Sequence, residues 1–334
     1  MAQLMEQDQI GKRESLADLI AVAEIETTPY TAMIEKRKRP DQMDHSWQMK
    51  GYRVAGHGGV IDGVDASNFH FTPRSRTHCY AQKVWDPVAV SDLADEATVA
   101  GVAKGEMSAQ IADAFVTTSQ IIERRCLSRS DTQEQAAPTA AYETRGIFSW
   151  LSPTAQTTFP VPADFRPNSG QLYSSTLAAF KEADLLSLGR AAFKRRKGPI
   201  TLKGIVGVDL KALISNFTRY DDTVDTKTAV RRFNQNADDK AVVNVIDRIV
   251  CDTGTIELHV SSFLATDAAT GADTAYTHSS GVFLDMDMVG LAYTRLPRVF
   301  KLPYQGGGQK AVVDAIFLHQ VDNPVGMFMA EINS

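Results

Sequence analysis

The sequence predicts an α+β fold in which an N-terminal arm and a long hairpin loop extend from a folded body. Three observations support this prediction. A long segment after Pro40 is rich in glycine, aspartate and histidine, residues 105–128 show a helical apolar period, and several runs between residues 242 and 332 are strand-like. The chain has 334 residues, a net charge of −5 and 43% hydrophobic residues. This composition is typical of a globular protein and excludes collagen or a disordered chain.

Signals for membrane insertion, secretion and disulfide formation are absent from the sequence. The longest apolar runs resemble residues 19–23, far short of the roughly 18 residues that a membrane helix requires. Residues 1–20 do not resemble a signal peptide. Cys79, Cys126 and Cys251 are odd in number and far apart, which indicates free thiols in a reducing compartment. We therefore expect a soluble protein that is made in the cytoplasm. The mild acidity also argues against a dedicated DNA-binding protein.

The first part of the chain predicts a short helix, a basic run and a hairpin. Residues 12–26 carry an amphipathic pattern, and the run Lys36–Arg39 follows. Residues 45–54 predict one arm of the hairpin and residues 69–80 its return arm, with the glycines of 55–66 between them. A lone hairpin buries too little apolar surface to be stable, so other surfaces must cover it. Its larger side chains are Trp47, Met49, Tyr52, Phe69 and Phe71.

Residues 105–128 predict the longest helix of the chain. Apolar side chains recur at steps of three and four residues, including Met107, Ile111, Ala114, Ile121 and Ile122. At 1.5 Å per residue such a helix is about 36 Å long. This length indicates a structural spine.

The second half of the chain predicts a mixture of helices and strands. Helical patterns cover 172–197 and 209–217, with a strand at 200–208 between them and Asp209 as the N-cap of the second helix. Further strands are predicted at 242–250, 256–264, 282–293, 296–303, 310–320 and 325–332, with turns at Asp252–Thr255 and Gly306–Gly308.

Residues with catalytic or metal-binding chemistry form no recognised motif. The seven histidines, His45, His57, His70, His78, His259, His278 and His319, show no metal-ligand spacing. Because His57, His70 and His78 share the hairpin region, a metal or hydrolase site there stays an alternative to solvated loop histidines. Asp285 and Asp287 are predicted on one side of a strand, either as a cation site or as an exposed face. We predict no enzyme activity, cofactor or metal.

Two basic runs have different interpretations. Lys194–Lys197 lies at the C-terminal end of a helical pattern, where positive charges interact favourably with the helix dipole. Lys36–Arg39 has no hydrophobic periodicity around it. It is consistent with three settings: an acidic neighbouring subunit, packaged nucleic acid or plain solvent.

Several stretches, taken in order, resemble the Hong Kong 97-type major capsid proteins of tailed bacteriophages. Residues 14–34 (ESLADLIAVAEIETTPYTAMI) resemble the opening arm, and 45–52 (HSWQMKGY) are similar to the first strand of the extended loop. Residues 109–128 (AQIADAFVTTSQIIERRCLS) resemble the spine helix, with RGIFSWL (145–151) after it. Residues 241–264 (AVVNVIDRIVCDTGTIELHVSSFL) resemble the family's characteristic hairpin, and residues 282–297 (VFLDMDMVGLAYTRLP) resemble the strand that follows it.

The resemblance implies a domain organisation. The N-terminal arm would cover 1–44 and the extended loop 45–83. Residues 84–150 and 286–334 would form the peripheral domain, and 151–285 the axial domain. The helical pattern at 172–197 departs from what the family leads us to expect. Arm and loop would complete their folding against neighbouring subunits, so removal of residues 1–40 is expected to leave a folded core that forms no closed shells.

The resemblance also implies a function and partners. The chain would form pentamers and hexamers of an icosahedral head, in the virion, around double-stranded DNA. Scaffolding, portal and decoration proteins are the implied partners, with non-specific contact to the packaged DNA and none to a membrane. The expected contacts between subunits are Lys36, Arg37, Lys38, Arg39, Trp47, Met49, Tyr52, Phe69 and Phe71. Alternatives are an encapsulin-like nanocompartment shell, a hydrolase or metal enzyme, and a tail-tube or fibre protein.

Overall fold

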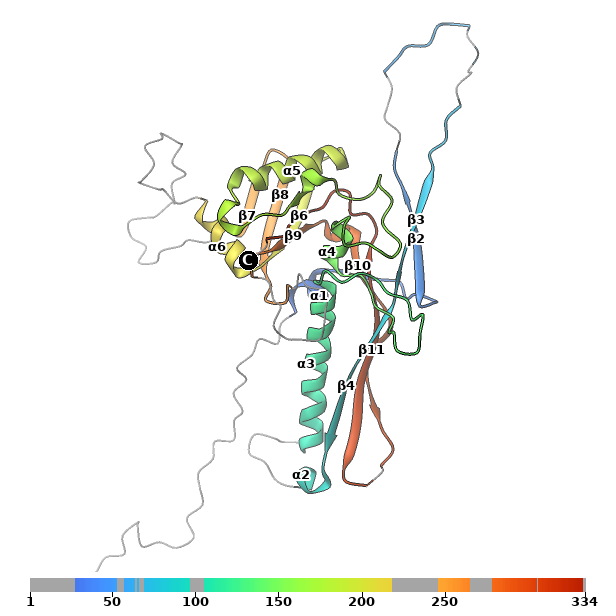
Figure 1. The fold of residues 1–334 in the computed structure, drawn as a ribbon, viewed down its shortest axis with the longest axis vertical. Coiled ribbons are helices and arrows are strands. Elements are labelled where there is room, and N and C mark those ends of the chain that lie inside the picture. Colours follow the sequence, from blue (N-terminus) through green and yellow to red (C-terminus); the bar gives the residue numbers. More distant parts are fainter. Residues whose placement is uncertain are drawn as a thin grey trace, which may run out of the picture.

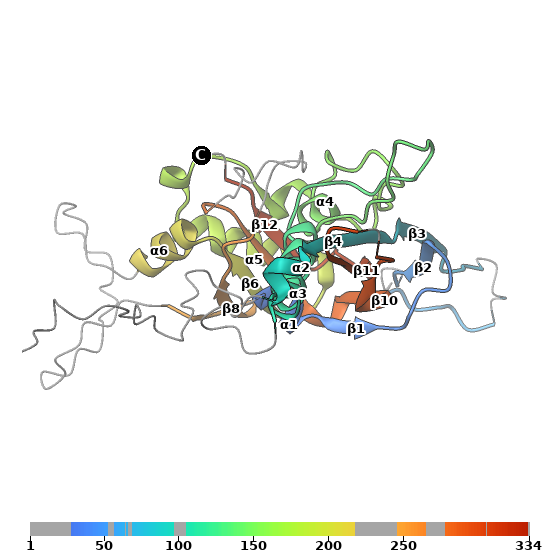
Figure 2. The same cartoon turned by 90° about the horizontal axis from the view of Figure 1, so that it is seen from below.

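The structure consists of two β-sheets, a long helix and an extended hairpin (Figure 1). It is a computed structural model that describes residues 28–52, 57–63, 65, 69–96, 105–217, 246–264, 278–304 and 306–332. The helix expected at 12–26 lies outside these residues. Figure 2 shows the molecule from below, with β1, α1 and α3 toward one face and β12 and α4 toward the other. The mixture of helix and sheet agrees with the predicted α+β class.

The first sheet has four strands in the order β1-β10-β11-β4. The long strands β10 (Val289–Lys301) and β11 (Gln309–Val321) form an antiparallel hairpin, and β4 (Gln82–Val90) pairs antiparallel with β11. The short strand β1 (Glu35–Arg37) runs parallel to the start of β10. At the turn between β10 and β11, Gly306, Gly307 and Gly308 all have positive φ, which glycine adopts without strain. The predicted glycine turn is therefore confirmed.

The long helix α3 (Glu106–Cys126) lies along the four-stranded sheet and confirms the predicted spine. It begins after Gly105, whose φ is +86°. The Asp95 carboxylate, at the end of α2 (Asp92–Glu96), accepts the Met107 backbone N–H at 3.1 Å and satisfies one of the free donors of the first turn. The buried face of α3 consists of Met107, Ala114, Thr118, Ile122, Glu123, Arg125 and Cys126.

The second sheet has six strands in the order β5-β12-β9-β6-β8-β7. Their bounds are Leu172–Tyr173 (β5), Ile200–Val206 (β6), Arg248–Cys251 (β7), Gly254–Val260 (β8), Gly281–Leu284 (β9) and Phe328–Ala330 (β12). Helices α5 (Glu182–Arg196) and α6 (Val208–Asn216) pack into the same apolar cluster as this sheet. Within that cluster the rings of Phe283 and Phe328 stack with centroids 4.4 Å apart. The hairpin of β7 and β8 agrees with the prediction at this position.

The extended hairpin pairs β2 (Asp44–Lys50) with β3 (Arg74–Tyr80) and rises away from both sheets (Figure 1). Its register runs without a shift from Asp44–Tyr80 to Lys50–Arg74. Between Lys50 and Arg74 the described residues form no strand. The predicted arms at 45–54 and 69–80 were therefore too long, and Phe69 and Phe71 lie in the loop.

The helix predicted at 172–197 is wrong in its first third. Only Glu182–Arg196 is α-helical, and Tyr173 lies in β5. Phe180 packs edge-on against Tyr173 with the ring centroids 4.8 Å apart, so the chain turns back on itself before α5 begins.

The prediction of Asp209 as an N-cap is also wrong. Gly207 occupies the N-cap of α6, and Asp209 lies in the first turn. A Cβ atom at Gly207 would collide with the His278 carbonyl oxygen, so the tight passage from β6 into α6 requires a glycine there.

The strand predicted at 282–293 is interrupted. A 3₁₀ turn at Met286–Met288 separates β9 from β10, because the Asp285 carboxylate accepts the Asp287 backbone N–H and closes the turn. Asp285 is buried and Asp287 exposed, so the two carboxylates do not share one side of a strand. The division into peripheral and axial domains stays a prediction, although the last strand, β12, pairs with β9 in the six-stranded sheet.

The main core lies between the spine helix, the four-stranded sheet and α4 (Ile147–Leu151), every residue of which is buried. Trp150 is fully buried there, with the Arg145 guanidinium carbon 4.6 Å from the centre of its ring. The Trp47 ring from the hairpin lies 5.6 Å from it. Trp150 therefore joins the root of the hairpin to the core.

We predict that Trp150→Ala lowers the free energy of unfolding of the subunit by about 3–5 kcal/mol, because it removes a large buried ring and leaves a cavity. Urea denaturation of the unassembled subunit measures the effect. Trp85→Ala is the matched control. Trp85 is 65% exposed, so its removal should change stability by less than about 0.5 kcal/mol. Equal effects of the two substitutions would contradict the position of Trp150 in the core.

Candidate assembly surfaces

The beginning of the described chain is anchored to the spine helix. Helix α1 (Pro29–Met33) places the backbone N–H groups of Tyr30 and Thr31 on the Glu123 carboxylate, at 2.8 Å and 2.7 Å. Glu123 is buried, and burial raises the pKa of its carboxyl group, although the bonds from the arm act in the opposite direction. Each oxygen of this carboxylate thus satisfies one donor from the first turn of α1.

Tyr30 continues the anchor into the four-stranded sheet. Its hydroxyl lies 2.7 Å from Nε2 of His319 on β11, and Nδ1 of His319 lies 2.9 Å from the Arg145 carbonyl oxygen. Because a carbonyl oxygen only accepts hydrogen bonds, Nδ1 carries the proton, and Nε2 accepts from Tyr30. Burial lowers the pKa of His319 to about 4.

This anchor corrects the expectation for residues 1–40. Tyr30 is fully buried and Ile34 is buried beside it in the main core. A truncation through residue 40 would remove part of that core, so it would not leave the body intact. Truncation tests of the arm must stop before Thr28.

The root of the hairpin loop belongs to the core of its own subunit. Met49 is 4% exposed, and Trp47 packs on Trp150. On the opposite strand Cys79 is fully buried, and the Arg145 backbone N–H points at its sulfur over 3.3 Å. The structure therefore gives Met49 and much of Trp47 partners inside the subunit.

The outer part of the hairpin loop exposes large apolar side chains. Their exposed fractions lie between 78% and 87%, and they are Tyr52, Val60, Ile61, Phe69 and Phe71. Such a group is uncommon on a monomeric protein and typical of a surface that another chain covers. Three of the five, Tyr52, Phe69 and Phe71, are predicted contact residues.

A buried ion pair fixes the segment that supports the hairpin root. Arg145 is fully buried, and its Nε donates to Asp131 Oδ1 at 2.7 Å. The other oxygen of Asp131 accepts the backbone N–H groups of Thr157 and Thr158, at 2.7 Å and 2.9 Å. Although burial raises the pKa of Asp131, the guanidinium and these N–H groups outweigh that effect and lower it. Asp131 thus joins Arg145 to the backbone at residues 157 and 158.

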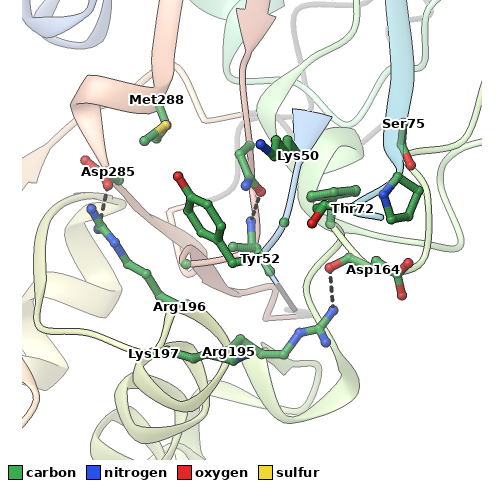
Figure 3. Close-up of a pocket in the computed structure, with 16 residues that line it drawn as sticks. Lys50, Tyr52, Thr72, Ser75, Asp164, Arg195, Arg196, Lys197, Asp285 and Met288 are labelled. Atoms are coloured by element: carbon green, nitrogen blue, oxygen red, sulfur yellow. Dashed lines mark hydrogen bonds and ion pairs between the residues drawn. The ribbon is translucent and has the colours of Figure 1, made fainter. Parts of the chain in front are cut away.

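A cavity of about 710 Å³ lies between the hairpin root and the end of α5 (Figure 3). Arg195 donates to the carbonyl oxygens of Ala163, Asp164 and Arg166, over 3.1–3.2 Å, and Arg196 pairs with Asp285 at 2.5 Å. These two cations therefore bind the end of α5 to neighbouring loops. The predicted position of Lys194–Lys197 at the end of a helix is confirmed, since the run occupies the last turn and the C-cap of α5.

The other basic run leads from β1 into the hairpin. Arg37 crosses Gly290, where a Cβ atom would collide with it, and forms ion pairs with Glu35 and Asp322 at 2.8 Å and 2.9 Å. Lys36, Lys38 and Arg39 are exposed. Within the described part of the chain, none of these three side chains makes an ion pair or hydrogen bond.

The model of the SU10 major capsid protein family matches residues 3–328 of this chain. The chain belongs to this family. It is a family of structural capsid proteins, and the match favours a phage head over a nanocompartment shell. The predicted resemblance to Hong Kong 97-type capsid proteins is thereby confirmed. No curated protein matches the sequence.

Solved phage capsids share the fold of this capsid protein. The capsid of cyanophage A-1(L) has a TM-score of 0.61 and 11% sequence identity, with 98% of each chain covered. A native gene transfer agent particle gives 0.59 and 9%, covering 97% of this chain and 96% of that one. Cyanophage P-SCSP1u gives 0.58 and 12%, covering 96% and 93%. The predicted fold class is confirmed by these likenesses.

The alternative of a metal site in the hairpin region receives no support from the described residues. His78 pairs with Asp44 at 2.8 Å, and His319 forms a hydrogen bond with the Tyr30 hydroxyl. No group of three His, Cys, Asp or Glu side chains in the described ranges is arranged to hold a metal ion. In the same ranges, no helix is long and apolar enough to cross a bilayer.

The sequence interpretation missed the anchor of Tyr30, Glu123 and His319. A weak signal existed, because a glutamate on the apolar face of the spine helix requires a partner. Nothing in the spacing identified that partner, since Tyr30 and Glu123 are 93 positions apart.

We predict that the capsid subunit loses stability as the pH falls from about 6.5 to about 4. The unfolded chain takes up a proton on His319 near pH 6.5, whereas the folded chain does so only near pH 4, so protons favour unfolding between these values. His319 alone would contribute about 3 kcal/mol over this window.

Urea titrations of wild type and His319→Gln between pH 7 and pH 4 measure this contribution. The substituted subunit should show a shallower decline, even though its stability at pH 7 is lower. Parallel declines in the two proteins would show that His319 does not set the pH dependence.

Proposed function

We propose that this chain is the repeating subunit of an icosahedral head, assembled as pentamers and hexamers around double-stranded DNA. One observation carries the proposal: the hairpin loop presents Tyr52, Val60, Ile61, Phe69 and Phe71 to solvent on a root that is fixed to the core. The subunit itself does not cover these side chains. A neighbouring copy would cover them in a closed shell.

The energetics suit reversible assembly. Complete burial of one large apolar side chain stabilises by roughly 1.5–3 kcal/mol. Association opposes this gain with the loss of translational and side-chain freedom, so one loop contact alone would be weak. In a shell every subunit gives and receives such contacts, and many weak contacts then hold the assembly.

The predicted intersubunit contacts separate into two groups by burial and pairing. Tyr52, Phe69, Phe71, Lys36, Lys38 and Arg39 are exposed, and we propose them as contact residues. Arg37 and Met49 already have partners in their own subunit, and Trp47 packs on Trp150. For these three we propose supporting roles, because a neighbour would find little free surface on them.

The proposed partners are a scaffolding protein, a portal protein, a decoration protein and the packaged DNA. The net charge of −5 supports a weak, non-specific contact with DNA, since a strongly basic wall would adsorb the phosphates and hinder packing. We propose synthesis in the host cytoplasm, residence in the virion and a structural role without catalysis.

Electron microscopy of the expressed protein, with light scattering on the same sample, is the first test. Pentamers, hexamers, closed shells or tubes would support the proposal. A subunit that stays monomeric even with candidate scaffolding proteins from its own genome would contradict it.

We predict that Phe69→Ser/Phe71→Ser reduces the yield of shells by at least about tenfold while the subunit keeps its fold. The loss of two buried rings from each contact would exceed the roughly 1.4 kcal/mol that corresponds to a factor of ten. Sedimentation measures the yield, and urea denaturation measures subunit stability. Val250→Ser is a control with an exposed apolar side chain outside the loop. An undiminished yield from the double variant would show that the loop tip is not a contact.

A further inference from the structure

The cavity between the hairpin root and the end of α5, which we call the α5 cavity, has a volume of about 710 Å³. Four cationic and two anionic side chains line it: Lys50, Arg195, Arg196, Lys197, Asp164 and Asp285. Figure 3 shows Lys50 on the hairpin side and Arg195 and Lys197 on the α5 side, with Tyr52 between them. Two separate parts of the subunit therefore bring positive charge to one space.

One of the four cations is neutralised within the lining. Arg196 pairs with Asp285 at 2.5 Å, and the Asp285 side chain is only 8% exposed. Gly326 packs against Arg196, because a Cβ atom at Gly326 would lie 3.0 Å from Arg196 Cδ. This pair is complete in the subunit and leaves no charge for a ligand.

Arg195 has hydrogen-bond acceptors but no counter-ion. Its Nη2 donates to the carbonyl oxygens of Ala163, Asp164 and Arg166. These acceptors are uncharged, and Arg195 forms no ion pair with the described residues. Its Nε is buried without a hydrogen-bond partner. A buried donor of this kind indicates an acceptor that the subunit alone does not supply.

Lys50 and Lys197 also lack a counter-ion. Both are exposed, and neither forms an ion pair or hydrogen bond with the described residues. Lys50 Nζ lies 5.6 Å from the centre of the Tyr52 ring, a contact that leaves its charge in place. Asp164 is the remaining carboxylate of the lining. Three positive charges against one negative charge give the cavity a net charge of +2.

The end of α5 offsets only part of this charge. A helix C-terminus carries the equivalent of about half a negative elementary charge. The Lys197 backbone N–H donates to the Phe193 carbonyl oxygen at 2.7 Å and so satisfies one of the free carbonyl groups of the last turn. More than one positive charge remains, and the cavity attracts an anion.

The hairpin side adds hydroxyl donors and a contact with the loop that Arg195 holds. Thr72 and Ser75 line the cavity, and their hydroxyl groups have no partner among the described residues. At Gly51 a Cβ atom would lie 3.5 Å from the Phe165 ring. The hairpin therefore packs against residues 163–166. A ligand in the cavity would touch the hairpin and α5 together.

These features select a small phosphate anion as the ligand. Near pH 7 a phosphate group carries about −1.5 to −2 charges and has three acceptor oxygens. This charge matches the excess of +2, whereas a carboxylate would leave half of it. Lysine and arginine are the usual cations of phosphate sites. The volume of about 710 Å³ lies within the range of roughly 300–1,000 Å³ that small-molecule sites occupy.

We propose that the α5 cavity binds a small phosphate anion between Lys50 of the hairpin and Arg195 and Lys197 of α5. The anion accepts hydrogen bonds from these three cations and from the hydroxyl groups of Thr72 and Ser75. It removes the repulsion among the cations and joins the hairpin root to α5. The site belongs to the single subunit, so it does not depend on assembly into a shell.

Calorimetric titration of the unassembled subunit with pyrophosphate, at constant ionic strength, tests the proposal. Lys50→Gln/Lys197→Gln should weaken binding at least about tenfold, because this factor corresponds to only about 1.4 kcal/mol and two charged donors are lost. The matched control is Lys38→Gln/Lys194→Gln. It also removes two exposed lysines, one of them from the last turn of α5, but neither lines the cavity, so it should bind like wild type.

Hydrogen exchange locates the bound anion independently. Pyrophosphate should slow the exchange of backbone amides at residues 50–52 and 163–166 in wild type, because the anion joins these segments to α5. The same amides should not respond in Lys50→Gln/Lys197→Gln. The urea midpoint of wild type should rise with pyrophosphate but not with sodium chloride at the same ionic strength. Urea denaturation without pyrophosphate confirms that each variant is folded.

The outcomes distinguish this site from a DNA-binding surface. Equal affinities of wild type and Lys50→Gln/Lys197→Gln for pyrophosphate, or no binding by wild type, would overturn the inference. Binding of double-stranded DNA that depends on the two lysines, without binding of pyrophosphate, would also overturn it, because the cations would then form an open nucleic-acid surface. None of these results bears on shell formation, which is measured separately.

Discussion

The buried carboxylate of Glu123 is the interaction on which the arrangement of the subunit depends. It accepts two backbone N–H groups of α1, and Tyr30 then reaches His319 on β11. The arm, the spine helix and the four-stranded sheet are thereby fixed to one another by groups that water does not reach. Because β1 and the hairpin follow α1 directly in the chain, their positions depend on the same contact.

The fold could be predicted where the pattern is local and repetitive. The apolar period of α3, the alternation of β8 and the continuous apolar run of β11 needed no tertiary information. The errors arose where a distant contact decided the conformation. Phe180 packing on Tyr173 ended a helix-like sequence, and the carbonyl of His278 required glycine rather than an acidic residue at the start of α6.

The assembly surfaces were predictable in kind but not in extent. The expectation that Phe69 and Phe71 contact another surface followed from a lone hairpin that buries too little apolar surface to be stable, and both side chains are exposed in the subunit. The basic run at 36–39 gave no hint of Arg295 and Arg298, which line a groove with it only because β1 pairs with β10 across more than 250 positions. Sequence distance hides such a cluster, and the register shifts in β10 cannot be read from residue types.

The hairpin consists of a braced, paired root and an unpaired outer segment, and this difference has a mechanical consequence. Its paired strands are braced by Trp47 against Trp150, whereas the segment beyond Lys50 has no strand pairing among the described residues. The hairpin would therefore pivot where the two indole rings are in contact. A small rotation at the rings would move the distal end further than the root, and a load applied there would reach the core at Trp150 and Arg145. Strain that builds up as a shell closes or fills would thus converge on this pair of tryptophans.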